Sequence, residues 1–326
     1  MLSRSQSVRN LLTVSALTKP DIMELLGLAD HYKRVVCNTG TCDDLKGSVM
    51  TSLFYEPSTR TSCSFKAAML RLGGSVLDVD INSSSVKKGE SLEDTVQTLS
   101  SYSDCIVMRH PERHSVHQAA NYSKVPVINA GDGIGEHPSQ ALLDLYTIYL
   151  ELGIEKSPRA NPQPLKIGLV GDLKHGRTVH SLIQCLTKIN NKIMFYLISP
   201  ETLKLPNEYL NDYPHFVESK LENCISDLDV LYVTRIQKER FSIAQEYDAV
   251  KNSYIIDQSL MKQAKEQMIV MHPLPRLDEI AKDVDQDPRA AYFRQVKYGM
   301  YMRMAILSKF MMKIQPHRPV LNIHGD

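Results

Sequence analysis

The fold is decided by the stretch Phe54-Tyr55-Glu56-Pro57-Ser58-Thr59-Arg60-Thr61-Ser62, where an apolar run from Val49 stops and a helical pattern begins. This pattern predicts a strand, a tight turn and a helix N-terminus. The first turn of a helix has unpaired N–H groups and the positive end of the dipole, so it can bind an anion without a metal. Three hydroxyl groups and the planar cation of Arg60 add donors suited to phosphate. The alternative, from this segment alone, is a capped helix whose arginine pairs with a structural carboxylate.

Composition indicates a globular chain with two domains. The chain has 326 residues, of which 43% are hydrophobic and 23% charged. Its formal net charge of +1 provides no general attraction for nucleic acid or membrane, so any anion binding must rest on local clusters. The six cysteines form no C-x-x-C pair, which is typical of reduced thiols in a cytosolic protein. No apolar run approaches the length that a membrane span needs.

The N-terminal residues 1–20 contain three cations and no acidic residue, a composition weakly typical of a transit peptide. However, Leu11–Val14 has the pattern of folded structure, and Thr18–Asp21 has the pattern of a helix start. These segments leave too little chain for a separate targeting peptide. We therefore predict a cytoplasmic location.

Short β-branched runs alternate with helical patterns, which predicts two parallel-sheet α/β domains. The strands expected in the first half are 48–54, 75–81, 105–108 and 125–129, and the helices are 62–72, 92–103, 112–122 and 137–152. A proline-rich segment at 153–164 indicates an exposed connection near a domain boundary. The strands expected after it are 165–170, 192–198, 230–234 and 268–271. A methionine-rich helical segment at 288–314 is more typical of core packing than of a ligand site.

The predicted strand ends carry the residues with the most chemistry, and ligands of open parallel sheets collect at the carboxyl ends of strands. These residues are Arg60, Arg109, His110, His137, Gln140, Arg177, Arg235, Gln237, His272 and Arg276. A cationic set with no carboxylate pair suits a polyanionic substrate that needs positioning and charge stabilisation. The expected ligand combines a phosphate with carboxylates.

Other chemistries have weaker support in the sequence. No H-E-x-x-H, C-x-x-C or EF-hand pattern occurs, so we expect no metal and no other cofactor. The helical spacing of His110, His114 and His117 is more typical of a solvated helix face than of a metal site. Gly168–Asp172 is related to a dinucleotide-binding turn but lacks G-x-G-x-x-G, which makes a nicotinamide enzyme a second interpretation.

Taken together, the motifs make the chain resemble the aspartate carbamoyltransferase family, especially the animal-type domain of multifunctional pyrimidine-synthesis polypeptides. The resemblance covers the chain from about Leu11 to Lys313. Its motifs are Ser58–Thr61, Ser84–Glu90, Met108–Pro111, Gly131–Gln140, Gly171–Thr178, Thr234–Arg240 and His272–Arg276. The resemblance implies transfer of the carbamoyl group of carbamoyl phosphate to L-aspartate. The products would be N-carbamoyl-L-aspartate and phosphate, in de novo pyrimidine (UMP) biosynthesis.

The resemblance also implies a domain organisation, that of the aspartate/ornithine carbamoyltransferase fold. Residues 1–144 would form the carbamoyl-phosphate-binding domain and residues 145–291 the aspartate-binding domain. The C-terminal helix, residues 292–316, would pack back on the first domain. Residues 317–326 would form a tail.

The family's site residues carry over to matching positions of this sequence. Carbamoyl phosphate would be bound by Ser58, Thr59, Arg60, Thr61, Ser84, Lys88, Arg109, His137 and Gln140. Aspartate would be bound by Lys88, Arg177, Arg235, Gln237 and the backbone carbonyl of Leu274. The catalytic set would be Arg60, Thr61, Lys88, Arg109 and His137. Glu56 and Arg240 would pair when the two domains close.

The chemistry of the transfer follows from these roles. Arg109, His137 and Thr61 would stabilise the oxyanion on the carbamoyl carbon. A helix N-terminus disfavours a protonated imidazole, so we expect His137 to be a neutral donor. No side chain is placed as an obvious base, so we expect the departing phosphate to take the amine proton.

The resemblance further implies a homotrimer in which Ser84 and Lys88 serve the neighbouring subunit's site. The chain could be fused to, or associated with, carbamoyl-phosphate synthetase and dihydroorotase. The nearest alternative is ornithine carbamoyltransferase, which has His-Cys-Leu-Pro where this chain has His272-Pro273-Leu274-Pro275. A second alternative is a scaffold that has lost activity, which the intact set of cations and His137 disfavours.

Overall fold

The computed structural model describes residues 10–154, 164–190, 192–210, 213–238, 241 and 243–312. Arg240, the last residues of the expected C-terminal helix (313–316) and the expected tail (317–326) lie outside this range.

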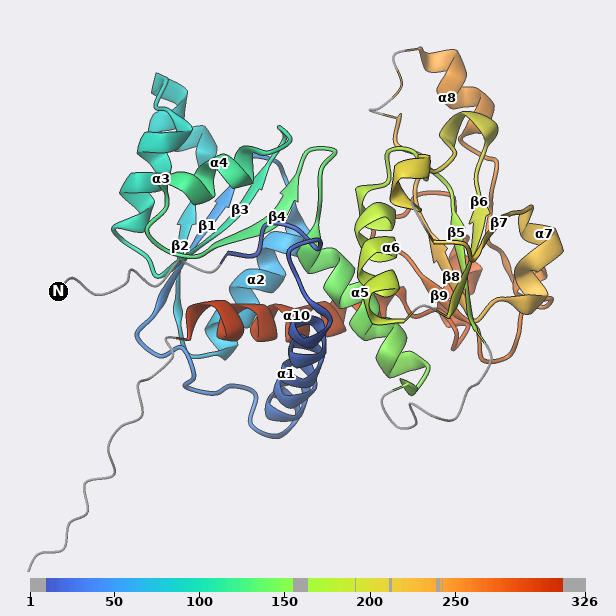
Figure 1. Cartoon of the computed structure of the whole chain (residues 1–326), viewed down its shortest axis with the longest axis horizontal. Helices are drawn as coiled ribbons and strands as arrows, with labels where there is room; N and C mark the ends of the chain where they lie inside the picture. Colours follow the sequence, from blue (N-terminus) through green and yellow to red (C-terminus); the bar gives the residue numbers. More distant parts are fainter. Residues whose placement is uncertain are drawn as a thin grey trace, which may run out of the picture.

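A four-stranded parallel sheet with the order β2-β1-β3-β4 forms the first unit (Figure 1). Its strands are β1 (Val49–Phe54), β2 (Ser75–Val79), β3 (Cys105–His110) and β4 (Val127–Asp132). The connecting helices are α2 (Thr59–Arg71), α3 (Leu92–Ser100) and α4 (Ser115–Tyr122). Before them, Leu11 bridges to Ile128 of β4. α1 (Lys19–Asn38) begins in a capping box formed by Thr18 and Asp21, which confirms the predicted helix start.

Among the element boundaries that differ from the sequence prediction, those of β3, β4 and α2 affect the strand-end residues. β3 and β4 run past their expected ends because His110 pairs with Asp132 after a register shift, and the Gly133 N–H donates to the His110 carbonyl at 2.8 Å. Arg109 therefore lies within a strand and not in the loop after it. α2 begins at Thr59 and not at residue 62, because hydroxyl side chains at a helix start carry no apolar periodicity.

A five-stranded parallel sheet with the order β7-β6-β5-β8-β9 forms the second unit. Its strands are β5 (Leu165–Val170), β6 (Ile193–Ile198), β7 (Phe216–Glu218), β8 (Val230–Val233) and β9 (Ile269–Met271). Its helices are α6 (Arg177–Ile189), α7 (Leu221–Cys224), α8 (Ala244–Val250) and α9 (Gln258–Met261). The sequence does not predict β7, because its three residues are all exposed at a sheet edge and show no alternation.

Two long helices join the units. α5 (Pro138–Glu151) packs against both α6 of the second unit and the C-terminal helix α10 (Tyr292–Met311). α10 also packs against α1 and α2, so the C-terminal helix returns to the first unit as the resemblance implies (Figure 1). The expected boundary between residues 144 and 145 falls within α5 and stays a prediction.

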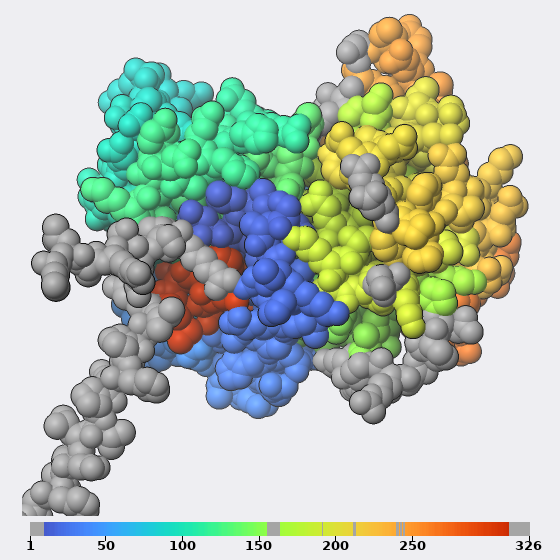
Figure 2. Space-filling model, viewed as in Figure 1, coloured from blue at the N-terminus to red at the C-terminus, as the bar shows by residue number. Residues whose placement is uncertain are grey.

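One apolar core runs through both units. It includes Met50 and Val107 of the first sheet, Leu142 of α5, and Ile167 and Leu169 of the second sheet. In Figure 2 the red surface of α10 lies beside the blue N-terminal part of the first unit, with the yellow and orange second unit opposite. None of the helices within the described ranges is both long and apolar enough to span a bilayer.

Short 3-10 turns complete the described chain. They are η1 (Ile81–Ser83), η2 (Ser85–Lys88), η4 (Glu201–Leu203), η5 (Asn207–Tyr209), η6 (Ile225–Asp227) and η8 (Lys282–Gln286).

Candidate active site

The two units meet at the carboxyl ends of their strands, beside the N-terminus of α5. Arg177, the first residue of α6, donates through Nη1 to the carbonyl oxygen of Gly133 just beyond β4. The backbone N–H of His137 donates to Oγ of Ser181 on α6 at 3.2 Å. These contacts bring strand-end residues from both units into one cluster, where ligands of open sheets are expected.

The first turn of α2 faces an environment that favours an anion. Ser58 occupies the N-cap position, but its side chain makes no capping hydrogen bond, so it leaves the first N–H groups of the helix uncapped. Thr59 is exposed, whereas Thr61 is buried. Burial and the nearby charge of Arg109 lower the pKa of Arg60, yet a guanidinium stays protonated near neutral pH. Two cations at a helix N-terminus therefore form a strongly anion-attracting site.

The guanidinium group of Arg109 contacts Glu56 and Ser58. Its Nε lies 3.1 Å from Oε2 of Glu56, and its Nη1 lies 3.5 Å from Oγ of Ser58. Burial lowers the pKa of Arg109, and the Glu56 carboxylate opposes that shift. Glu56, which the resemblance pairs with Arg240, thus contacts Arg109 in this structure. Arg240 lies outside the described residues, so the expected closure pair stays a prediction.

His137 is a buried imidazole at the N-cap of α5. Burial lowers its pKa well below the usual value, and the charges of Arg177, Arg109 and Arg303 lower it further. The helix N-terminus alone suggested a neutral ring, and the structure adds burial and three cations as stronger causes. Its Nδ1 lies 3.3 Å from Oγ of Ser139. In the tautomer whose Nδ1 accepts from this hydroxyl, the ring proton is on Nε2, where it can be donated to a ligand.

Gln140 lies almost one turn further along α5 and is mostly buried. It lines a small cavity of about 30 Å³ together with Arg60, Ser64, Leu143, His272, Pro273, Gln295, Val296 and Arg303. The cavity joins the predicted phosphate cradle on α2 to the segment after β9. The structure thereby brings Arg60 and Gln140 next to residues of the second half of the sequence.

Gly131 is required by the packing of two arginines. Its φ is +115°, and a Cβ placed there would lie 3.2 Å from Nη2 of Arg177 and 3.5 Å from Nη1 of Arg109. The backbone near the end of β4 thus lies close to both guanidinium groups. A residue with a side chain at this position would displace them.

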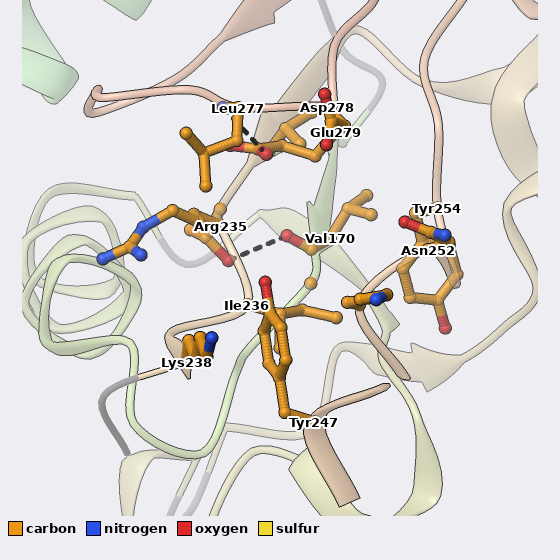
Figure 3. Close-up of a pocket in the computed structure, with 14 residues that line it drawn as sticks. Val170, Arg235, Ile236, Lys238, Tyr247, Asn252, Tyr254, Leu277, Asp278 and Glu279 are labelled. Atoms are coloured by element: carbon orange, nitrogen blue, oxygen red, sulfur yellow. Dashed lines mark hydrogen bonds between the residues drawn. The ribbon is translucent and has the colours of Figure 1, made fainter. Parts of the chain in front are cut away.

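A larger cavity, of about 390 Å³, opens at the carboxyl ends of β5 and β8 (Figure 3). Among its lining residues, the cations Arg235, Lys238 and Lys251 outnumber the acids Asp278 and Glu279. In Figure 3, Arg235 extends away from Tyr247 and Tyr254. Gln237 is half-buried and does not line this cavity.

The segment after β9 approaches both cavities. His272 is buried, and its Nε2 lies 2.8 Å from Oε1 of Glu279, while its Nδ1 accepts the N–H of Leu274 at 2.8 Å. Leu274 has a φ of +56°, an uncommon left-handed conformation for a leucine, and precedes a cis peptide bond to Pro275. These hydrogen bonds hold the backbone that carries the Leu274 carbonyl.

Ser84 and Lys88 are not brought into this cluster. Ser84 precedes η2, where its Oγ donates to the carbonyl of Ile81 at 3.0 Å, and Lys88 is exposed. The helix that follows this loop, α3, lies at the outer side of the first unit, away from α5 and α6 (Figure 1). No hydrogen bond or ion pair between described residues joins either residue to Arg60, Arg109 or His137.

Sequence reasoning missed several polar groups behind the cluster. Asp144 on α5 and Arg303 on α10 are fully or almost fully buried, and Gln295 and Tyr232 contact Asp144. The available signal was a charged residue within an apolar run of a predicted helix, since such a charge is seldom buried without a partner. Our assignment of the C-terminal helix to packing alone overlooked Arg303, which lines the small cavity.

The three histidines considered as a metal site do not form one. His110 Nδ1 accepts the backbone N–H of Glu112 at 3.1 Å, and the rings of His114 and His117 meet edge to face with centroids 5.7 Å apart. Across the described ranges, no group of three or more His, Cys, Asp or Glu side chains could hold a metal ion.

Comparisons with known proteins identify both halves of the chain. The family profile "Aspartate/ornithine carbamoyltransferase, carbamoyl-P binding domain" matches residues 9–150. The profile "Aspartate/ornithine carbamoyltransferase, Asp/Orn binding domain" matches residues 163–310.

Individual relatives are similar over nearly the whole chain. "Multifunctional protein pyr1-3" of Dictyostelium discoideum is 50% identical over 305 residues, which cover 92% of this chain but only 13% of that protein. "Aspartate carbamoyltransferase catalytic subunit" of Clostridium botulinum is 47% identical over 312 residues, covering 93% of this chain and 98% of that protein. Among solved structures, aspartate transcarbamoylase from Trypanosoma cruzi in complex with carbamoyl phosphate has a TM-score of 0.86 and 43% identity. The match covers 94% of this chain and 97% of that chain.

Proposed function

The chain belongs to the aspartate/ornithine carbamoyltransferase family, and from this premise we propose that it transfers the carbamoyl group of carbamoyl phosphate to L-aspartate. The products are N-carbamoyl-L-aspartate and phosphate. This transfer is an early reaction of pyrimidine biosynthesis. The observation that carries the proposal is the convergence of Arg109 and Arg177 on the buried His137, with Arg60 close to Arg109. This arrangement suits a doubly anionic donor and a dicarboxylate acceptor.

Carbamoyl phosphate binds at the start of α2. Ser58, Thr59, Arg60 and Thr61 hold the phosphate through hydroxyls, the guanidinium and the uncapped N–H groups. The carbonyl oxygen of the carbamoyl group accepts hydrogen bonds from Arg109, His137 and Thr61. Gln140 binds the carbamoyl amide. The spatial proximity of Arg60, Arg109 and Gln140 supports this assignment.

The chemical step is an addition and elimination. The neutral amine of aspartate attacks the carbamoyl carbon, a C–N bond forms, and negative charge develops on the carbonyl oxygen. Arg109, His137 and Thr61 stabilise that charge. The C–O bond to phosphate then breaks, and the departing phosphate takes the amine proton.

Aspartate binds between the two units. Arg177 and Arg235 pair with its two carboxylates, Gln237 assists, and the Leu274 carbonyl accepts from the amine. The excess of cations at the 390 Å³ cavity favours a carboxylate over the cationic side chain of ornithine. Pro273, where the ornithine signature has cysteine, supports the same choice.

We propose that domain closure pairs Glu56 with Arg240, which requires Glu56 to leave Arg109 or to share its carboxylate. Arg240→Ala is then expected to raise the KM for aspartate more than the KM for carbamoyl phosphate, because the pair forms around the second substrate. Equal changes in both KM values would contradict the closure role.

The functional assembly that we propose is a homotrimer. Ser84 and Lys88 belong to the loop before α3, a helix at the outer side of the first unit (Figure 1). We propose that they reach the site of a neighbouring subunit, where Lys88 contacts both substrates. The position of α3 on the side of the first unit away from α5 and α6 supports this arrangement (Figure 1).

We further propose that the chain works fused to, or associated with, carbamoyl-phosphate synthetase and dihydroorotase in the cytoplasm. Its similarity to proteins named multifunctional, of which it spans 13% of the length, supports the fusion. All six cysteines lie in the described residues and are free thiols, which suits a reducing compartment.

The test is to supply carbamoyl phosphate with L-aspartate or with L-ornithine, without added metal and with a chelator control. Both the carbamoylated amino acid and the released phosphate are measured. We expect product from aspartate alone. Product from ornithine alone would assign the chain to the other branch of the family. Phosphate binding without either product would support the inactive scaffold.

A further inference from the structure

Asp144 accepts hydrogen bonds from three separate elements. Its Oδ1 accepts from Nε2 of Gln140 on α5 at 2.9 Å and from Nε2 of Gln295 on α10 at 2.6 Å. Its Oδ2 accepts from the hydroxyl of Tyr232 on β8 at 2.7 Å. The carboxylate has no exposed surface. It therefore lies at the point where the two units and the C-terminal helix meet.

An ionised carboxylate can only accept hydrogen bonds, whereas a glutamine amide has one donor end and one acceptor end. Asp144 therefore requires Gln140 to present its NH₂ group, which turns the Oε1 of Gln140 away from Asp144. A carbamoyl group carries an NH₂ that needs an acceptor. The orientation that Asp144 imposes is thus the one in which Gln140 can accept from the substrate.

The same logic applies to Gln295. Its Nε2 is committed to Asp144, and its Oε1 accepts the backbone N–H of His272 at 3.0 Å. His272 begins the segment that contains Leu274. The backbone carbonyl of Leu274 is proposed to bind the aspartate amine. Both ends of the Gln295 amide are therefore used to tie this segment to Asp144.

We propose that Asp144 is a positioning residue for both substrates: it orients the Gln140 amide toward the carbamoyl group and, through Gln295, holds the segment that carries Leu274. This inference rests on the proposed carbamoyl transfer and adds a residue to that site. Asp144 touches neither substrate. It acts by requiring the side-chain amides of Gln140 and Gln295 to turn their NH₂ ends toward it.

The charge of Arg303 opposes the protonation of Asp144. Burial raises the pKa of Asp144, whereas the charge of Arg303, buried nearby on α10, favours the ionised carboxylate. The other titratable groups near it are Tyr232 on β8 and Cys185 on α6, both buried. Of Arg303, Tyr232 and Cys185, Arg303 alone is cationic. Its positive charge offsets part of the cost of burying Asp144.

The first experiment compares Asp144→Asn with Tyr232→Phe. The asparagine has the same size but presents an NH₂, so Gln140 can turn over and face the carbamoyl group with its donor end. We expect kcat/KM for carbamoyl phosphate to fall about 10- to 100-fold, as when a buried hydrogen-bond donor loses its partner. Tyr232→Phe removes the third hydrogen bond to the same carboxylate and contacts no proposed substrate ligand. We expect it to change kcat/KM less than threefold.

A double-mutant cycle separates positioning from general damage. In a Gln140→Ala background, Asp144→Asn has no amide at position 140 left to misorient. Its effect on kcat/KM for carbamoyl phosphate should then shrink to a small fraction of its effect in the wild type. Full additivity of the two substitutions would overturn the inference.

A second variant keeps the inference testable if Asp144→Asn does not fold. Gln295→Leu cuts the link to the His272 N–H and leaves the Gln140 contact intact, so it should raise the KM for aspartate more than the KM for carbamoyl phosphate. The reverse order, or equal changes, would overturn the inference. A wild-type chain without carbamoyl transfer would overturn the proposed function and this inference together. An active wild type with additive variants would overturn the inference alone.

Discussion

At the scale of single residues, His137 is the group whose protonation state matters most. A buried imidazole beside three arginines stays neutral, because a further positive charge there would be both desolvated and repelled. The neutral ring keeps one N–H to donate. It can therefore stabilise an oxyanion throughout the neutral pH range without changing its charge.

This role leads to a prediction for His137→Ala. Removing one oxyanion donor should lower kcat by about 10²- to 10³-fold. Phosphate binding at the start of α2 should change little, because His137 is not in the predicted cradle. Steady-state kinetics and a phosphate titration on the same variant measure both. Weakened phosphate binding with an unchanged kcat would contradict the assignment.

Asp144 predicts a pH dependence with a definite sign. Burial raises its pKa from 3.8 to about 7, although the hydrogen bonds from Tyr232, Gln295 and Gln140 and the charge of Arg303 oppose the shift. Protonation turns one oxygen of Asp144 into a donor and weakens the acceptor that orients Gln140, so activity should rise as the pH passes upward through about 7. In Asp144→Asn this rise in the pH–rate profile should disappear, and the rate should be lower than in the wild type at every pH.

Stability should respond in the opposite direction. Between about pH 4 and 7 the native state holds a proton on Asp144 that the unfolded chain has released, so this group's contribution to stability falls as the pH rises. Relative to the wild type, Asp144→Asn should therefore be more stable at pH 8 than at pH 5. Denaturant unfolding at the two pH values measures the difference. A difference that does not change with pH would contradict the shifted pKa.

At the scale of elements, the backbone near the end of β4 limits how closely two arginines can approach it. Gly131→Ala places a Cβ 3.2 Å from Nη2 of Arg177 at a φ of +115°, so both the backbone and the guanidinium must shift. We expect a loss of about 1 to 3 kcal/mol in the free energy of unfolding and a higher KM for aspartate. Gly27 in α1 provides the control, because a Cβ there meets no atom within 4 Å. Gly27→Ala should stabilise the protein by up to about 1 kcal/mol and leave both KM values unchanged.

How much of each element the sequence predicts depends on where its signal lies. β5 is predicted to its ends, because its apolar run is bounded by Pro164 and Gly171. β7 could not be predicted, because an exposed edge strand of three residues lacks alternation. The strand-end cations were accessible from sequence because parallel sheets place strand ends together. Asp144 was not, because two of its partners, Tyr232 and Gln295, are more than 80 residues away along the chain.

At the scale of the whole molecule, the proposed site is divided unevenly. Arg60, Arg109, His137 and Arg177 gather where the two units of one chain meet. Ser84 and Lys88 belong to a loop whose following helix lies at the outer side of the first unit (Figure 1). If all these residues serve one reaction, a second copy of the chain must supply the loop. This division makes the trimer testable without a structure of the assembly.

The test mixes two inactive chains, Arg60→Ala and Lys88→Ala. In a cyclic trimer each site takes Arg60 from one subunit and Lys88 from its neighbour, so every hybrid trimer has one site that inherits neither defect. After unfolding and reassembly of an equal mixture, about one quarter of the wild-type activity should return. Mixing Arg60→Ala with Arg109→Ala is the matched control. The structure places these two residues in the same chain's site, so no hybrid should regain activity. Recovery in the control, or no recovery with Lys88→Ala, would show that the loop does not serve a neighbouring subunit.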